Sequence, residues 1–139
     1  MISLLMNSFH SSDFRILIVD DDPLIRAFLK AFCEVNNYHA EFAGNGTDAL
    51  RLIGENSSYL LVIVDFLMPR MHGIEFIKQV KEKWRDLPVI AMSAWEDVGK
   101  SLIEAGACLF LKKPLDPYVL EREIEVIRSA AMGGNPGCP

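Results

Sequence analysis

Carboxylates gather at the ends of two apolar segments of the chain. Asp20, Asp21 and Asp22 directly follow an apolar run that begins at Ile16, and Asp65 ends a second apolar run. Anions at the ends of buried strands repel one another unless a cation or a catalytic role offsets the repulsion. Mg²⁺ prefers hard oxygen ligands and commonly shares them with phosphate. The pattern therefore predicts a magnesium site that handles phosphate.

Two other polar side chains stand at the ends of predicted strands. Ser93 closes the apolar segment 88–93, and Lys113 follows the segment 107–112. In open parallel α/β sheets, functional groups collect at the carboxyl ends of the strands, near the point where the strand order reverses. Four strands are thus expected to bring carboxylates, a hydroxyl and an ammonium to one edge.

Five strand-like segments alternate with helix-like segments. The strand-like segments are 15–20, 38–43, 59–65, 88–93 and 107–112. Most are continuous runs of Val, Ile and Leu, which is typical of parallel strands covered on both faces. In the second segment His39 and Glu41 alternate with apolar residues, which predicts an edge strand with one wetter face.

The helix-like segments complete a (βα)₅ pattern. They cover 24–32, 47–54, 74–84, 96–105 and about 116–128. Asp22 before Pro23 predicts an N-cap, and Gly106 predicts a helix end. The alternation predicts an α/β fold, a doubly wound parallel five-stranded sheet with right-handed crossovers and helices on both faces.

Length and composition favour one domain. The chain has 139 residues, 50% of them hydrophobic, which suits a single core. We expect an N-terminal extension at 1–13, a folded domain at 14–129 and a flexible Gly- and Pro-rich tail at 130–139. The net charge of −5 without a basic cluster argues against direct binding of nucleic acid. Neither a secretory signal nor a membrane span is indicated.

The cysteines give little sign of cross-linking. Cys33, Cys108 and Cys138 are odd in number, widely spaced and free of CxxC motifs. This pattern predicts neither a disulfide framework nor a zinc site. A reduced, cytoplasmic setting fits it best.

Four segments together resemble a known family. In order and spacing, ILIVDDDPLIR, LVIVDFLMPRMHGIEF, PVIAMSAWED and CLFLKKPLD resemble the signature segments of response regulator receiver domains of two-component signalling. The resemblance covers nearly all of the predicted core, 15–128. It implies a flavodoxin-like sheet with strand order 2-1-3-4-5.

The resemblance also implies roles for the acidic residues. Asp65 corresponds to the phosphoacceptor, a carboxylate nucleophile that becomes an aspartyl phosphate. Asp21 corresponds to a direct Mg²⁺ ligand, and Asp20 acts mainly through bound water. Asp65 itself and the backbone carbonyl of Leu67 complete the metal site. Asp22 is better explained as a helix cap.

Roles for the other site residues follow from the same resemblance. Ser93 would donate its hydroxyl to the phosphoryl group, with the Ala94 backbone N–H as a second donor. Lys113 would hold a phosphoryl oxygen or, before modification, the Asp65 carboxylate, and the Lys113-Pro114 bond would be cis. Phe110 and Ser93 correspond to the switch pair.

Ordinary structural explanations remain open beside these roles. Ser93 also suits a helix cap, and Phe110 suits an edge-strand core aromatic equally well. Lys112 fits a solvated strand-end lysine. His72 stands where an acid is frequent, and Trp95 is bulky for the edge of the site. One hypothesis is that Trp95, with Leu67, restricts attacking water and prolongs the life of the phosphoryl group.

The predicted function is phosphoacceptance in a two-component or phosphorelay system. The donor would be a histidine kinase or histidine phosphotransfer protein, and the domain would catalyse its own Mg²⁺-dependent phosphorylation and dephosphorylation without being an enzyme by task. A downstream protein effector would read the face of the fourth helix, fifth strand and fifth helix. The alternatives are a phosphorylation-independent binding module and an aspartyl phosphatase. The second would need a DxD motif, but the chain reads Asp65-Phe66-Leu67.

Overall fold

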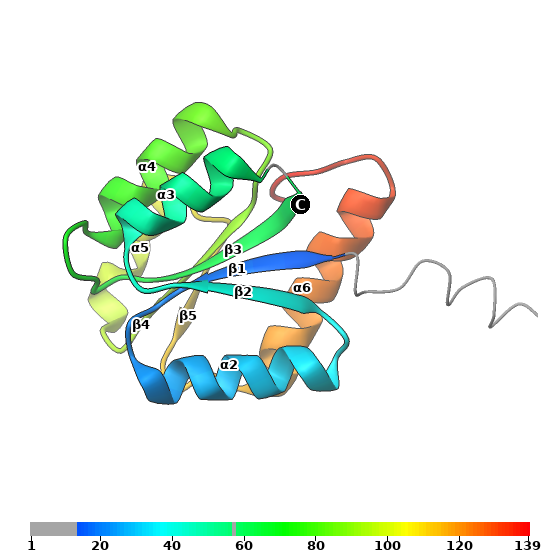
Figure 1. Cartoon of the computed structure of the whole chain (residues 1–139), viewed down its shortest axis with the longest axis horizontal. Coiled ribbons are helices and arrows are strands. Elements are labelled where there is room, and N and C mark those ends of the chain that lie inside the picture. The colour runs from blue at the N-terminus through cyan, green and yellow to red at the C-terminus, as the bar shows by residue number, and fades with distance from the viewer. Residues whose placement is uncertain (1–13, 57) are drawn as a thin grey trace, which may run out of the picture.

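The protein forms a five-stranded, all-parallel sheet (Figure 1). The computed structural model describes residues 14–56 and 58–139. The strands are β1 (Arg15–Val19), β2 (His39–Ala43), β3 (Tyr59–Asp65), β4 (Val89–Ser93) and β5 (Leu109–Lys112), in the order β2-β1-β3-β4-β5. The expected strand order is confirmed.

Strand burial follows the sequence pattern. All of β4 is buried, and so are all residues of β3 except Leu60, because helices cover both faces of a parallel sheet. At the sheet edge, β2 leaves His39 exposed and Glu41 half-buried. The prediction of an edge strand with one wetter face is therefore confirmed.

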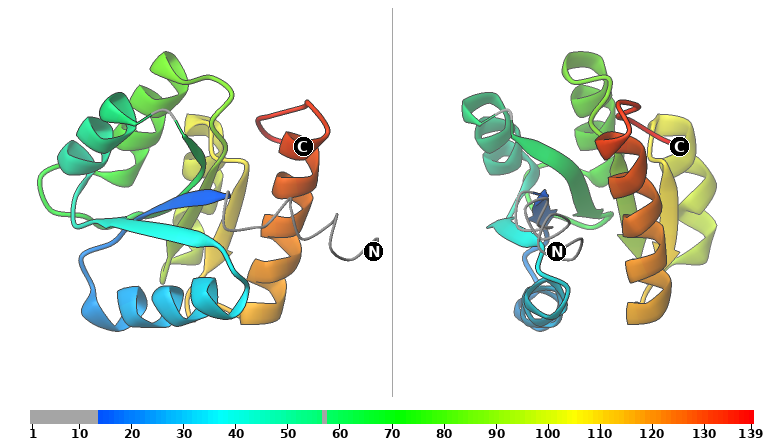
Figure 2. Two further views of the ribbon diagram at one scale, coloured as in Figure 1. Left: turned by 45° about the vertical axis from the view of Figure 1, so that its right-hand side comes forward. Right: turned by 90° about the vertical axis from the view of Figure 1, so that its right-hand side faces the viewer.

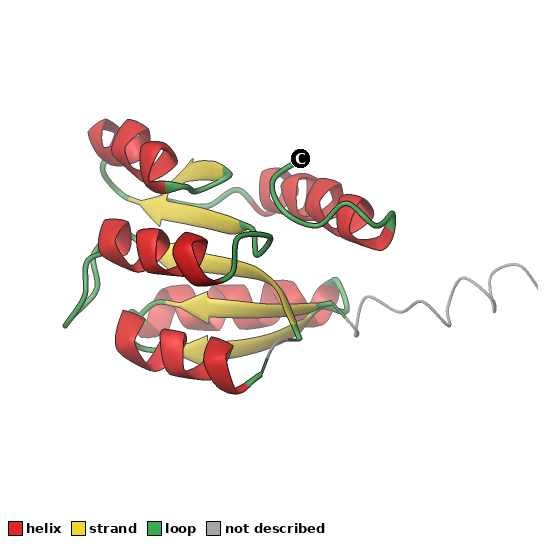
Figure 3. Cartoon of the chain, turned by 90° about the horizontal axis from the view of Figure 1, so that it is seen from above, coloured by secondary structure: helices red, strands yellow, loops and turns green. Residues whose placement is uncertain are grey.

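Helices cover both faces of the sheet (Figure 3). They are α2 (Pro23–Val35), α3 (Gly46–Glu55), α4 (Gly73–Lys83), the 3-10 turn η2 (Glu96–Val98) that leads into α5 (Gly99–Ala105), and α6 (Pro117–Met132). Helices α3, α4 and α5 pack on one face and α2 and α6 on the other. This is the predicted doubly wound (βα)₅ arrangement.

Alternation along β1 divides the core into two layers. Leu17 and Val19 point toward α3, α4 and α5, whereas Ile16 and Ile18 point toward α2 and α6. All four side chains are fully buried. Because successive strand side chains face opposite ways, a one-residue register error would exchange the two layers. The register fixes which strand residues reach the functional edge.

Side-chain caps begin three of the helices. The Asp22 side chain accepts a 2.9 Å hydrogen bond from the Leu24 N–H, and Pro23 occupies the first helical position. Asn45 and Asp116 cap α3 and α6 in the same way. An N-cap satisfies amide donors that lack partners inside the helix. The predicted capping role of Asp22 is confirmed.

The last helix is longer than predicted, and the chain turns back after it (Figure 2). Helix α6 continues to Met132, three residues beyond the predicted boundary at Ser129. Residues 133–139 then turn back from the helix end (Figure 2). The amides of Gly133, Gly134 and Asn135 donate to carbonyls in the last turns of α6.

A disulfide joins Cys108 to Cys138, with 5.3 Å between their Cα atoms. The expectation of no disulfide is therefore wrong. The two residues are 30 positions apart, and only the return of the tail to the start of β5 brings them together. Their spacing carries no motif that would reveal this. In the parts of the chain that the structure describes, no helix is long and apolar enough to cross a membrane.

Candidate functional site

Three carboxylates converge at the carboxyl end of the sheet. Asp20 follows β1 and Asp65 ends β3, and these strands are neighbours with Val19 opposite Val64. One ligand oxygen from each of Asp20, Asp21 and Asp65 lies within 4.8 Å of the others. Asp20 and Asp65 are buried, whereas Asp21 is exposed. The cluster therefore has two recessed oxygen donors and one at its opening.

Lys113, the residue directly after β5, closes the cluster. Its Nζ lies 3.0 Å from Asp65 Oδ1 and 3.2 Å from Asp20 Oδ2. The contact with Asp65 was expected from the resemblance, but the contact with Asp20 was missed. The Lys113 amide donates to the Ser93 carbonyl at 2.8 Å, and the Lys113-Pro114 bond is cis, as expected. Backbone pairing with β4 thus holds the lysine at the site.

The electrostatic state of the cluster follows from burial and charge. Burial raises the pKa of Asp65, the Lys113 hydrogen bond opposes this, and the charge of Asp20 adds to the increase. Burial alone would lower the pKa of Lys113, but Asp65 and Asp20 outweigh it, so that pKa is raised. Lys113 therefore stays an ammonium. The ionised form of Asp65 is less favourable here than in water, because its contacts with Lys113 do not fully offset its burial and the charge of Asp20.

The donor set fits a hard divalent cation. Three carboxylates face one ammonium, which leaves an excess of two negative charges in a partly buried cluster. Carboxylate oxygens are suitable ligands for Mg²⁺, which keeps several positions for water or phosphate oxygen. The exposed position of Asp21 leaves the open side that such ligands need.

Ser93 ends β4 beside this cluster and is 3% exposed. Its Oγ accepts a 2.9 Å hydrogen bond from the Trp95 N–H, which is the capping-type contact that the sequence left open. A hydroxyl that accepts this bond still has its proton to donate. The neighbouring Ala94 is exposed, so a ligand can approach its surroundings from solvent.

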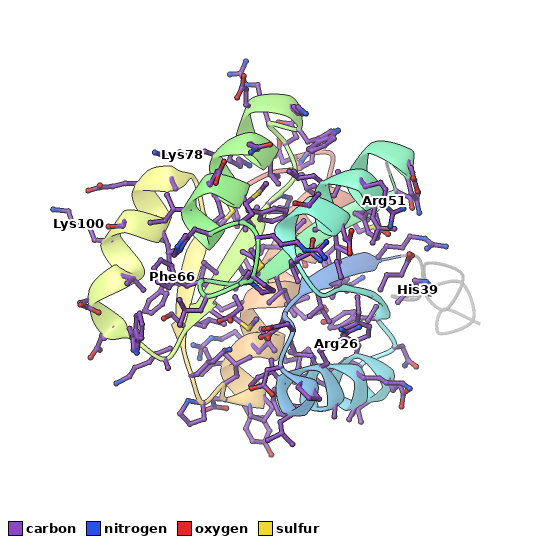
Figure 4. All side chains as sticks on the ribbon, turned by 60° about the vertical axis from the view of Figure 1, so that its left-hand side comes forward. Arg26, His39, Arg51, Phe66, Lys78 and Lys100 are labelled. Carbon is purple, nitrogen blue, oxygen red and sulfur yellow. A yellow bond between two sulfur atoms is a disulfide. The ribbon has the colours of Figure 1, made fainter. Side chains whose placement is uncertain are left out.

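Exposed apolar side chains closely follow the site residues Asp65 and Ser93 in the chain, and we call them the apolar rim. Leu67 and Trp95 are 46% and 52% exposed. Phe66 joins them, since its ring centroid lies 6.1 Å from that of Trp95 and 6.0 Å from that of His72. Phe66 is labelled in Figure 4. The sequence analysis did not assign Phe66 to the site, although its position directly after Asp65 could have indicated it.

Phe110 packs against α5 in a notch left by a glycine. A Cβ atom on Gly99 would lie only 2.7 Å from Phe110 Cδ2. Phe110 is half-buried and contacts the core cluster beneath α3, α4 and α5. The packing agrees with a core aromatic, and the switch role stays a prediction. The role of Gly99 was not predicted, because nothing in the sequence around this glycine at the start of α5 indicates that it packs against a side chain of β5.

Other charged residues lie outside the cluster. Lys112 forms a 3.7 Å ion pair with Glu96, and both side chains are largely exposed. This agrees with its interpretation as a solvated lysine. Arg26 lies with its guanidinium carbon 5.3 Å from the centre of the Phe42 ring, on the α2 side of β2 (Figure 4).

A family model decides which family this fold and site represent. The model described as the response regulator receiver domain matches residues 16–125, most of the chain. The chain belongs to the response regulator receiver domain family. It is thus a signalling domain of the two-component type, and its acidic pocket at Asp20, Asp21 and Asp65 fits use as a phosphoacceptor site.

Curated relatives extend beyond this receiver domain. Response regulator MprA of Mycobacterium sp. (strain KMS) is 34% identical over 124 residues, covering 88% of this chain and 52% of the relative. The protein of the same name from Mycobacterium ulcerans (strain Agy99) is 36% identical over 117 residues, covering 83% and 49%. The chain spans about half the length of these relatives.

Solved structures share the fold. The response regulator TrrA of Thermotoga maritima, solved in complex with Mg²⁺-BeF, has a TM-score of 0.76 and 30% identity, covering 81% of this chain and 97% of that chain. The signal receiver domain of a signal transduction histidine kinase from Syntrophus aciditrophicus has a TM-score of 0.78 and 32% identity, covering 84% and 91%. The first shows that a similar receiver domain carries Mg²⁺.

Proposed function

We propose that Asp65 accepts a phosphoryl group from the phosphohistidine of a histidine kinase or a histidine phosphotransfer protein. The supporting observation is the Lys113 ammonium 3.0 Å from Asp65, within a cluster of three carboxylates. If the cluster were only a structural ion pair, one carboxylate would be enough to balance the Lys113 ammonium, but three are present. The excess of negative charge suits a site completed by a cation and a phosphoryl group.

In the proposed transfer, Asp65 forms the covalent bond, and the other groups of the site position the phosphoryl group and balance its charge. An Asp65 oxygen attacks phosphorus in line, the bond from phosphorus to the donor imidazole nitrogen breaks, and that nitrogen keeps the electron pair. Asp20, Asp21, Asp65 and the Leu67 backbone carbonyl would hold Mg²⁺, with Asp20 acting mainly through water. The bound ion would neutralise charge on the phosphoryl oxygens.

The remaining side chains bind the transferred group. Lys113 moves its hydrogen bond from the Asp65 carboxylate to a phosphoryl oxygen, and Asp20 keeps it near the site. Ser93 and the Ala94 amide donate to other phosphoryl oxygens. Attack of water on phosphorus then breaks the bond to the Asp65 oxygen and releases inorganic phosphate, which restores the carboxylate. The domain thus catalyses its own phosphorylation and dephosphorylation.

The signal leaves through a protein surface. Binding of the phosphoryl group favours one of two states of the Ser93 and Phe110 pair, and a downstream effector reads the face of α5, β5 and α6. The absence of a basic cluster in the sequence supports a protein target instead of direct nucleic-acid contact. A cytoplasmic location suits a domain phosphorylated by a histidine kinase.

Phosphorylation with a small donor tests the proposal. The protein is incubated with Mg²⁺ and acetyl phosphate, and intact mass reports an acid-stable, base-labile phosphoryl adduct. We expect one adduct in the parent and none in Asp65→Asn. Glu82→Gln is the control, because it removes an exposed acid of α4 that forms no ion pair among the described residues. Loss of the adduct in both variants, or its persistence in Asp65→Asn, would contradict the assignment.

A parent protein that forms no adduct, yet folds and binds Mg²⁺, would favour the phosphorylation-independent binding module. Binding of Mg²⁺ is measured separately, as a shift in melting temperature. The two measurements distinguish an inactive site from a site that lacks its metal.

A further inference from the structure

The C-terminal tail is fastened at the end of the sheet opposite to the carboxylate cluster. Residues 133–139, here called the strap, run from the end of α6 to the start of β5, where Cys138 is bonded to Cys108. In a parallel sheet the segment before β5 lies at the amino end of the strands, whereas Asp65 ends β3 at the carboxyl end. The strap is therefore separate from the phosphoacceptor site.

The strap is seated on the domain. Gly137 is buried although its neighbours are exposed, and its backbone adopts φ +104°, a conformation that favours glycine. A Cβ atom there would lie 3.7 Å from the carbonyl oxygen of Asp86, in the loop between α4 and β4. The strap thus packs closely on this loop before it reaches the disulfide.

The strap borders a partly open cavity of about 310 Å³. Pro136 and Gly137 of the strap line it together with Trp84, Leu87 and Pro88. Among the described residues, backbone hydrogen bonds from the strap amides reach only α6. The packing of Gly137 holds the strap against the α4–β4 loop, and the disulfide fastens it to the start of β5. Loss of the disulfide would leave the packing alone.

The two sulfur atoms differ in access. Cys138 is exposed, while Cys108 is half-buried at the start of β5. Cys33 lies on the buried face of α2, and burial raises the pKa of its thiol to about 12, so it is a poor competitor in thiol exchange. A reductant can therefore reach the bond from the side of Cys138.

We propose that Cys108 and Cys138 form a reversible thiol–disulfide site that controls whether the strap covers the Trp84 cavity. The reductant is a dithiol, either a small molecule or a protein of the dithiol oxidoreductase class. Disulfides in a reducing compartment are usually transient or redox-sensing, so a cytoplasmic location would make this bond a switch instead of a permanent link.

The exchange balances as a two-electron reaction. A thiolate of the dithiol attacks Cys138 Sγ, the Cys108–Cys138 bond breaks, and Cys108 leaves as a thiolate that takes up a proton. The second thiol of the reductant, as a thiolate, attacks the mixed disulfide and releases Cys138, which is protonated in turn. The domain gains two thiols, and the reductant is oxidised to its disulfide.

Release of the bond changes two features of the domain. The strap can leave the α4–β4 loop, which exposes Trp84 and the apolar lining of the cavity. The bond also joins residues 30 positions apart, which closes a loop that contains β5 and α6, and reduction removes this constraint. The inference does not depend on phosphorylation of Asp65.

Thiol counting tests the bond. The chain has three cysteines, so denaturation and alkylation without reductant should modify only Cys33, and prior reduction should allow three modifications. Intact mass reports both results on a monomeric chain. Three modifications without reductant, in protein exposed to air during purification, would overturn the proposal. So would a disulfide-linked dimer.

Trp84 fluorescence tests the strap. The chain has two tryptophans, so Trp95→Phe leaves Trp84 as the sole reporter. In this background, reduction with dithiothreitol should raise the acrylamide quenching constant about twofold, because the strap opens locally while the domain stays folded. Unchanged far-ultraviolet circular dichroism shows that the fold persists. Quenching that stays constant while two thiols appear would overturn the proposal.

Three variants serve as matched controls in the same background. The Cys108→Ser/Cys138→Ser variant should show the high quenching constant with or without dithiothreitol. A chain ending at Asn135, which lacks the part of the strap that lines the cavity, should match it. The Cys33→Ser variant should keep the full redox response. A redox response that survives in the double variant would also refute the proposal.

Discussion

Replacing Asp21 by asparagine should stabilise the protein when Mg²⁺ is absent. The variant removes one charge from three carboxylates whose oxygens lie within 4.8 Å of one another. At this distance and in an aqueous dielectric, two unit charges repel by about 0.9 kcal/mol. Asp21 has two such neighbours, and it is exposed, so the aqueous value applies.

Screening and Lys113 reduce this gain. At about 0.15 M salt the Debye length is ~8 Å, which lowers each repulsion by roughly half. Attraction between Asp21 and the Lys113 ammonium offsets a further part. We expect the free energy of unfolding to rise by about 0.5–1 kcal/mol, which corresponds to a melting temperature about 2–4 °C higher for a domain of this size.

Mg²⁺ should reverse the order of stability. A ligand that binds only the folded protein stabilises it in proportion to its affinity, and Asp21→Asn removes a proposed ligand of the ion. The parent should gain stability as Mg²⁺ is added, while the variant gains much less. Above a certain Mg²⁺ concentration the parent should become the more stable protein.

Thermal unfolding in chelator and in a Mg²⁺ series measures both effects. Glu82→Gln, which makes the same charge change on α4, controls for net charge. A variant less stable than the parent in chelator would refute the electrostatic reasoning. An equal response to Mg²⁺ in parent and variant would refute the role of Asp21 in binding the ion.

Two other predictions concern the site. Burial raises the pKa of Asp65 in the folded protein above its value in the unfolded chain. Without Mg²⁺, Asp65 therefore stabilises the fold at pH values below the unfolded pKa, and this stabilisation is lost as the pH rises through the folded pKa. Asp65→Asn should therefore be more stable than the parent at neutral pH in chelator, and the difference should disappear as the pH falls toward 4; a constant difference would contradict this. If the exposed apolar rim restricts water, the phosphoryl group of Trp95→Ala should be hydrolysed about threefold faster than that of the parent, which corresponds to a barrier ~0.7 kcal/mol lower. An unchanged decay rate would show that Trp95 does not limit the access of water.

The sequence was enough to predict the layers of the fold. Continuous apolar runs predicted strands covered on both faces, and the alternation at His39 and Glu41 predicted the edge strand. Both follow from the local sequence, because successive strand side chains face opposite ways and their polarity shows which face is buried. The caps at Asp22 and Gly106 were also predictable, since they depend on neighbours within a few residues. The order of the strands came from the family resemblance.

The site was predicted in part. The carboxylates and Lys113 were found because each stands at the end of a strand, and parallel strands bring such ends together. The link from Lys113 to Asp20 was not found, because it depends on the conformation of a side chain that crosses from β5 to β1. The notch at Gly99 that receives the Phe110 ring was missed for a similar reason.

The sequence by itself determined where strands, helices and charged strand ends lie, because these follow from periodicity and residue type within short windows. Only the tertiary structure decided which distant residues meet. Cys108 and Cys138 have no motif between them, and their bond exists because the chain after α6 turns back over the α4–β4 loop to the start of β5. Contacts of this kind depend on the path of the whole chain, so they cannot be predicted from the residues within a short window.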